Sequence, residues 1–109
     1  MNSRLDTIQD ADWEALATKM HYTPESMAAC CSVSLRQLER FFKRHFDETP
    51  ESWLLRLRCR HAIELLRRGY KTVDAAKDLK FGNPSHFCRA FKKLQGRSPQ
   101  GFAPPFRLP

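Results

Sequence analysis

Two stretches decide the fold: SVSLRQLERFFKRHFDETPESW (residues 32–53) and KFGNPSHFCRAFKKLQGRSPQGF (residues 80–102). Residues match between them at a spacing of 49, and further upstream at a spacing of 48. The matched pairs are Leu38 with Phe87, Arg40 with Arg89, Phe42 with Phe91, Lys43 with Lys92, Pro50 with Pro99, Trp53 with Phe102, Ala28 with Ala76 and Val33 with Phe81. The chain therefore contains an internal repeat, and its second copy has one extra residue in or just after a turn.

Each copy predicts a short helix, a tight turn and a second helix that is apolar on one side and basic on the other. In the first copy, Ser34 followed by Gln37 is typical of a capping box at the start of the second helix. Leu38 and Phe42 then supply the apolar side. Two helices around a tight turn, with the second exposed, indicate a helix-turn-helix motif.

The rest of the chain also predicts helices, so the fold class is all-α: two helix-turn-helix subdomains joined by a long linker helix, with about seven helices. Thr72 is expected to cap a short helix that places Val73 inward, and Gly69 to end the linker helix. The expected divisions are an N-terminal extension (1–9), a first subdomain (10–48), a linker helix (49–69), a second subdomain (70–104) and a tail (105–109).

The charge is strongly positive and unevenly distributed. The formal net charge is +7 and the sequence pI is about 9.6. Residues 1–25 hold two basic and five acidic residues, whereas residues 26–109 hold seventeen basic and seven acidic ones. Such a balance favours polyanionic partners. The sequence predicts no membrane span and no secretory signal, so we expect a soluble cytoplasmic protein that does not bind membranes.

A major groove of double-stranded DNA admits one α-helix, which must present hydrogen-bond donors near its N-terminus and cations further along. The expected base contacts are Arg36, Gln37 and Arg40 in the first copy, and Asn83, Ser85, His86 and Arg89 in the second. The expected phosphate contacts are Lys43, Arg44, Lys92 and Lys93. The hypothesis is a bipartite site of roughly 20 base pairs, read in two neighbouring major grooves.

The second copy, FGNPSHFCRAFKKLQGRSP (residues 81–99), resembles the signature of the AraC/XylS family of bacterial transcription regulators. In that signature a phenylalanine, a Ser-His-Phe and an Arg-x-Phe-Lys precede a Gly-x-Ser-Pro. The resemblance implies seven helices, two helix-turn-helix motifs joined by a long helix, and transcription regulation, commonly activation through RNA polymerase. It also implies base contacts by Arg36, Gln37, Arg40, Ser85, His86 and Arg89, and phosphate contacts by Lys43 and Lys92.

The sequence departs from the family pattern at three points. Ser32 and Lys80 stand where the family often has a glycine in each turn, so altered turns are expected. Gly82 stands where a serine is usual, which shifts helix capping to Asn83. The chain has no room for an effector or dimerisation domain, so we expect either a stand-alone monomer or a fragment of a longer regulator, and no ligand response is predicted.

Two alternatives keep the fold but change the function. One is a protein-binding adaptor without specific DNA binding, against which the matched Arg40 and Arg89 argue. The other is a DNA-repair methyl acceptor, for which Cys30 or Cys31 would be the nucleophile. No catalytic residues, cofactor or metal site are otherwise predicted, so the chain is expected not to be an enzyme.

Overall fold

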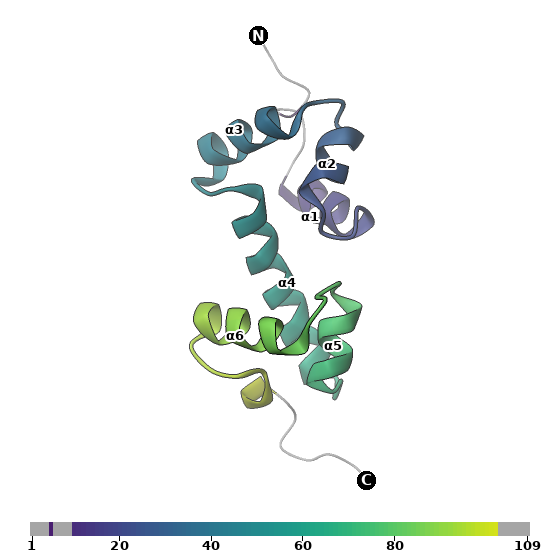
Figure 1. The fold of residues 1–109 in the computed structure, drawn as a ribbon, viewed down its shortest axis with the longest axis vertical. Coiled ribbons are helices and arrows are strands. Elements are labelled where there is room, and N and C mark those ends of the chain that lie inside the picture. The colour runs from purple at the N-terminus through teal and green to yellow at the C-terminus, as the bar shows by residue number, and fades with distance from the viewer. Residues whose placement is uncertain (1–4, 6–9, 103–109) are drawn as a thin grey trace. The chain divides into compact units, whose positions relative to one another are not determined.

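The computed structural model describes Leu5 and residues 10–102, which form helices connected by turns (Figure 1). In chain order they are α1 (Asp10–Lys19), α2 (Pro24–Cys30), α3 (Leu35–Phe46), α4 (Pro50–Arg67), α5 (Thr72–Asp78), α6 (Pro84–Gln95) and the short 3-10 helix η2 (Pro99–Phe102). No strand occurs among these residues, so the predicted all-α class is confirmed. The predicted extension (1–9), Leu5 excepted, and the predicted tail (105–109) lie outside the described residues.

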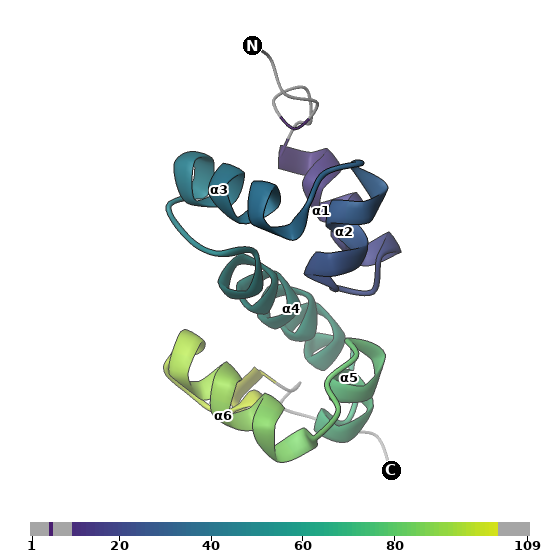
Figure 2. The same ribbon diagram turned by 45° about the horizontal axis from the view of Figure 1, so that its top comes forward.

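The chain divides into two compact units, with the boundary inside α4 between Leu54 and Leu55. The first unit contains α1, α2, α3 and the start of α4, and the second contains the remainder of α4 with α5, α6 and η2. Figure 2 shows the same succession in both units: a short helix, a turn and a longer helix. The finer limits, with a linker helix of its own at 49–69, stay a prediction.

Aromatic side chains form the core of the first unit. Trp13 of α1 and Phe42 of α3 are fully buried, and their ring centroids lie 5.0 Å apart in an edge-to-face arrangement. Phe42 also meets Trp53 of α4 edge-to-face, with ring centroids 5.3 Å apart and an interplanar angle of 85°. Such pairs contribute about 0.5–1.5 kcal/mol beyond the burial of their area. The inward face predicted for α3 is confirmed, because Leu38 is fully buried as well.

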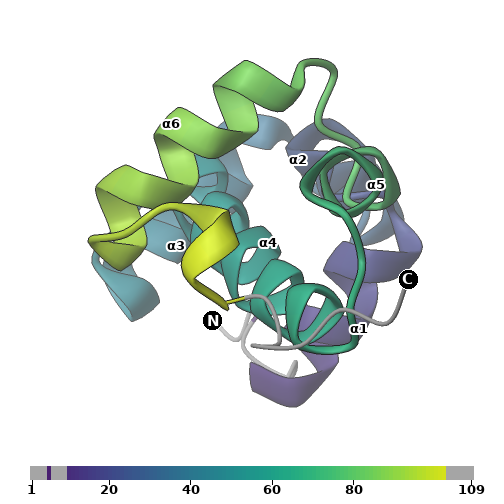
Figure 3. The ribbon, with the colours of Figure 1, turned by 90° about the horizontal axis from the view of Figure 1, so that it is seen from below.

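The second unit has a smaller aromatic core built on the same plan. Phe87 and Phe91 of α6 are fully buried, with ring centroids 5.6 Å apart. Figure 3 shows η2 beside α6, where Phe102 meets Phe91 edge-to-face at 5.3 Å and 83°. The Phe91–Phe102 pair therefore repeats the Phe42–Trp53 pair of the first unit, at the matched positions of the repeat.

Two expectations for α5 are wrong. Lys71, and not Thr72, is its N-cap residue, and no side chain caps this helix. Val73 was expected inside but is 57% exposed. The buried residues of α5 are Ala75, Ala76 and Leu79. At about 100° per residue, Val73 lies roughly 110° around the helix from the centre of that stripe, so it points away from the core.

Candidate nucleic-acid interface

The first helix-turn-helix motif consists of α2, a tight turn and α3. The Ser32 backbone N–H donates to the carbonyl of Ala29 at 3.0 Å, and the Val33 N–H donates to the carbonyl of Ala28 at 3.0 Å. Ser32 itself has a φ of 58°, in the left-handed region that favours glycine. The turn therefore reverses the chain within a few residues and leads directly into α3.

The second motif repeats this turn bond for bond. The Lys80 N–H donates to the carbonyl of Lys77 at 3.1 Å, and the Phe81 N–H donates to the carbonyl of Ala76 at 2.9 Å. Lys80 has a φ of 67°. The absence of glycine thus does not remove the left-handed conformation from either turn. Instead a non-glycine residue holds it, at a local cost of about 1–2 kcal/mol.

Side-chain caps fix where α3 and α6 begin. The Ser34 hydroxyl accepts from the Gln37 N–H at 3.1 Å, and the Gln37 side-chain oxygen accepts from the Ser34 N–H at 2.8 Å, so the predicted capping box is confirmed. The Asn83 side-chain oxygen accepts from two N–H groups in the first turn of α6, at 2.8 and 3.3 Å. Capping has therefore shifted to Asn83, as expected. The first turn leads directly into its cap residue, whereas Gly82 stands between the second turn and Asn83, so Gly82 is the extra residue of the second copy.

The ends of α3 and α6 also correspond. Asp47 terminates α3 with a φ of 56°, and its N–H donates to the carbonyl of Lys43 at 3.1 Å. Gly96 terminates α6 with a φ of 81°, and its N–H donates to the carbonyl of Lys92 at 2.8 Å. Both helices therefore end in a left-handed cap that satisfies an otherwise unpaired carbonyl.

The repeat extends one helix further upstream than the sequence comparison placed it. His21 after α1 and Gly69 after α4 both have positive φ, of 55° and 96°. The next residues, Tyr22 and Tyr70, each donate their N–H to the carbonyl five residues earlier, at 2.8 and 3.1 Å. The end of α1 therefore matches the end of α4. The recurrence of tyrosine at the upstream spacing of the repeat was the signal of this match in the sequence.

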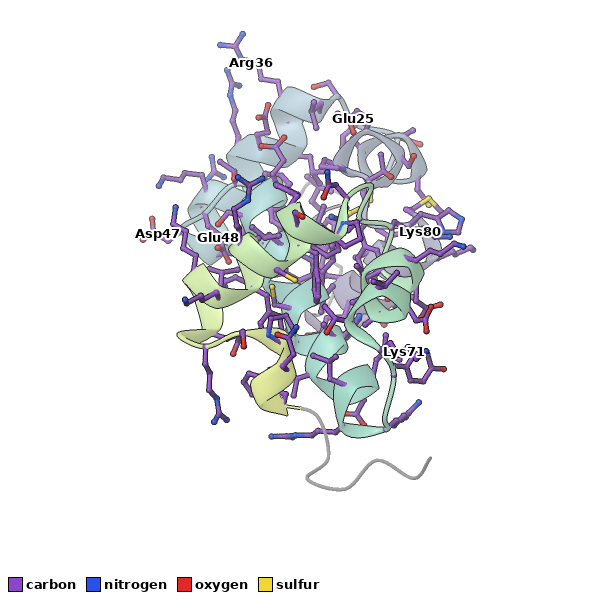
Figure 4. The ribbon with its side chains drawn as sticks, turned by 60° about the horizontal axis from the view of Figure 1, so that its bottom comes forward. Glu25, Arg36, Asp47, Glu48, Lys71 and Lys80 are labelled. Carbon is purple, nitrogen blue, oxygen red and sulfur yellow. The ribbon has the colours of Figure 1, made fainter. Side chains whose placement is uncertain are left out.

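The residues predicted to contact DNA from α3 share one property: all of them are exposed, on the side of the helix away from its buried aromatics. They are Arg36, Gln37, Arg40, Lys43 and Arg44. Figure 4 shows the Arg36 side chain extending outward from the ribbon. The Gln37 oxygen is engaged in the capping box, and the Lys43 Nζ lies 3.4 Å from the Asp47 Oδ1. Sequence reasoning missed this ion pair, although the spacing of four residues is typical of one.

The corresponding residues of the second motif are exposed as well. They are Asn83, Ser85, His86, Arg89, Lys92 and Lys93. The Asn83 oxygen caps α6, so its side-chain NH₂ is the group left for a base edge. The structure thus gathers each predicted set on one exposed helix face, and the contacts to DNA themselves stay a prediction.

Comparison with known proteins identifies the family. A family model described as a helix-turn-helix domain matches residues 27–103. The transcriptional regulator CdhR of Pseudomonas aeruginosa is 34% identical over 83 residues, which are 75% of this chain and 25% of CdhR. The transcriptional activator RhaS of an Enterobacter species is 39% identical over 77 residues, 70% of this chain and 28% of RhaS. The chain belongs to the AraC-type helix-turn-helix family of transcription regulators.

Solved structures agree with this AraC-type assignment. The DNA-binding domain of the global transcriptional factor AdpA, in complex with a target DNA, is 25% identical and has a TM-score of 0.74, covering 94% of this chain and 90% of that one. An AraC-type regulator from Chromobacterium violaceum shares the fold, with a TM-score of 0.71 and 24% identity over 80% of this chain and 84% of that one. The chain spans about a quarter of the length of the curated relatives named above.

The surroundings of Cys31 in this AraC-type chain do not favour its use as a thiol nucleophile. Cys30 is exposed but Cys31 is buried, and burial, together with the neighbouring Cys30, raises the pKa of the Cys31 thiol. A raised pKa lowers the thiolate fraction at neutral pH and with it the reactivity. Within residues 10–102 and Leu5, no group of three or more His, Cys, Asp or Glu could hold a metal ion. In the same part of the chain no helix is long and apolar enough to cross a membrane.

Proposed function

We propose that the protein binds a bipartite duplex site of roughly 20 base pairs, with α3 in one major groove and α6 in the next. The observation that supports this most strongly is the repetition itself. Both motifs have corresponding turns, helix caps and aromatic support, and each presents an arginine and a lysine at matched, exposed positions. A single reading helix would not need a second copy that preserves this whole arrangement.

The proposed roles follow from the chemistry of the side chains and their place on each helix. Arg36 and Arg40 on α3, and Arg89 on α6, can donate two hydrogen bonds to the O6 and N7 atoms of a guanine. Gln37, Asn83, Ser85 and His86 stand near the helix starts and contact base edges. Lys43, Arg44, Lys92 and Lys93 lie further along and bind phosphates, which supplies affinity and its salt dependence.

We further infer that binding activates transcription from a neighbouring promoter through contact with RNA polymerase. The support is the similarity to RhaS, which is described as a transcriptional activator. The proposal does not require dimerisation, because one chain already carries two motifs.

The proposal is tested by selecting bound duplexes from a randomised library at physiological salt and sequencing them. Two preferred blocks with centres about 10 base pairs apart are expected. Arg40→Ala should flatten the preference in one block and Arg89→Ala in the other, each weakening binding by about 1–3 kcal/mol. Lys19→Ala, which removes an exposed cation from α1, is the matched control and should change neither block. Enrichment of one block only would contradict bipartite reading, and enrichment of none would favour the adaptor.

A further inference from the structure

The segments that follow α3 and α6 carry opposite charge, although they occupy the same place in the repeat. We call residues 47–51 the first exit turn and residues 96–100 the second exit turn. The first, DETPE, has three carboxylates and no cation, whereas the second, GRSPQ, has one arginine and no carboxylate. Each contains a buried proline at the matched position, Pro50 or Pro99, so the two backbones correspond. The difference between them is therefore one of charge.

A local contact places one of these charges, that of Asp47, beside the proposed phosphate-binding residue Lys43. Asp47 Oδ1 lies 3.4 Å from the Nζ of Lys43, and both side chains are largely exposed, by 93% and 70%. The Glu48 Oε2 accepts from the Ser52 hydroxyl at 3.0 Å, which holds this carboxylate in the same turn. A phosphate that approaches Lys43 from solvent therefore also approaches the carboxylate of Asp47.

The second motif has no such carboxylate. Lys92 matches Lys43, but Gly96 stands four residues after it, so the corresponding ion pair cannot form. Arg97 matches Glu48 in the repeat, and its guanidinium carbon lies 4.5 Å from the centroid of the Phe102 ring. That contact keeps a cation in the second exit turn, beside the end of α6.

The backbone does not require an acid at the end of α3. Asp47 is left-handed, and glycine or asparagine would adopt that conformation at equal or lower cost. The Gly96 cap shows within the same chain that the turn forms without a charge. The charge of Asp47 is therefore not needed to form the turn.

We propose that the two motifs divide the work of binding DNA unequally, and that Asp47 sets this division. Its carboxylate competes with phosphate for Lys43 and repels phosphate. The first motif therefore contributes base reading but binds the phosphates weakly. The second motif supplies most of the sequence-independent affinity. This inference rests on the proposed function, because it requires Lys43 and Lys92 to face phosphates.

The test measures the affinity for a random-sequence 30-base-pair duplex over a range of salt concentrations. Asp47→Asn keeps a residue suited to the left-handed cap and removes the charge. It should make the slope of log affinity against log salt steeper by about 0.9, the value for one additional phosphate contact. Affinity at low salt should rise roughly threefold, as for removal of one charge about 7 Å from a phosphate in water. Asp12→Asn, the same chemical change at an exposed position of α1, is the control and should leave the slope unchanged.

The mirror experiment moves the acid to the second motif. Gly96→Asp should make the slope shallower by about 0.9 relative to Gly96→Asn, because the two variants share the backbone effect and differ in charge. Equal slopes for Asp47→Asn and Asp12→Asn, or for the two Gly96 variants, would overturn the inference while leaving the proposed function standing. A wild-type chain that binds neither this duplex nor a selected one at any salt concentration would overturn both.

Discussion

Replacing Lys80 with glycine should stabilise the second unit, because Lys80 holds a left-handed backbone conformation that L-residues with a Cβ adopt reluctantly. Its φ is 67°, and the turn bonds around it use only backbone atoms, at 3.1 Å from its own N–H and 2.9 Å from the N–H of Phe81. The lysine side chain is exposed. Glycine would therefore keep every turn bond and remove the strain.

The magnitude follows from two opposing terms. A residue with a Cβ costs about 1–2 kcal/mol in the left-handed region. Glycine loses about 0.5–1 kcal/mol more than alanine through the greater freedom of the unfolded chain. The net gain in the free energy of unfolding should be about 0.5–1 kcal/mol, which corresponds to a few degrees in Tm for a unit of this size.

The assay is urea unfolding followed by two signals. Both tryptophans, Trp13 and Trp53, lie in the first unit, so their fluorescence follows that unit, whereas far-UV circular dichroism follows both. Lys80→Gly should raise the midpoint in the dichroism signal, and Ser32→Gly should raise the fluorescence midpoint. Lys80→Ala removes the same side chain without relieving the backbone and should leave the midpoint nearly unchanged. If Lys80→Ala leaves the midpoint unchanged and Lys80→Gly is neutral or destabilising, Lys80 does not hold a strained left-handed conformation.

Three further predictions concern the core, a cap and a buried thiol. Phe42→Ala should lower the free energy of unfolding by about 3–5 kcal/mol in the fluorescence signal, because Phe42 is fully buried between two tryptophans; a loss below about 1 kcal/mol would contradict that packing. Asn83→Ala should cost about 1 kcal/mol, whereas Asn83→Ser should restore most of it, as measured by the same urea titration. Burial raises the pKa of the Cys59 thiol to about 11, so the folded state retains its proton while the unfolded state loses it near pH 9. Stability should therefore fall between about pH 9 and 11, and the urea midpoint of Cys59→Ala should fall less over that interval than that of the wild type.

Helix boundaries could be predicted wherever local chemistry determines them. The helix starts at Ser34 and Asn83 are examples, because each residue's own side chain caps its helix. The structure contains both caps. The left-handed turns at Ser32 and Lys80 could not be predicted from residue type, because serine and lysine rarely adopt this conformation and the bonds that close each turn join backbone atoms only. Val73 was misplaced because α5 has only seven residues, too few for a periodic pattern to define its buried side.

The exposure of the candidate interface residues could be predicted from the sequence, but not all of their contacts could. Arg40 and Arg89 recur at matched positions opposite buried aromatics, so their exposure followed from helical periodicity. The engagement of Gln37 in a cap was predicted from the Ser34–Gln37 spacing, whereas the pairing of Lys43 with Asp47 was not. These two contacts change which atoms are available to DNA.

Guanine N7 lies in the major groove, so its methylation by dimethyl sulfate tests most directly whether α3 and α6 read two neighbouring major grooves. On a selected duplex, the wild-type protein should protect two groups of guanines about 10 base pairs apart. At protein concentrations that saturate the duplex with each variant, Arg40→Ala should expose one group and Arg89→Ala the other. Protection of a single group, or loss of both groups in either variant, would contradict two independent reading helices.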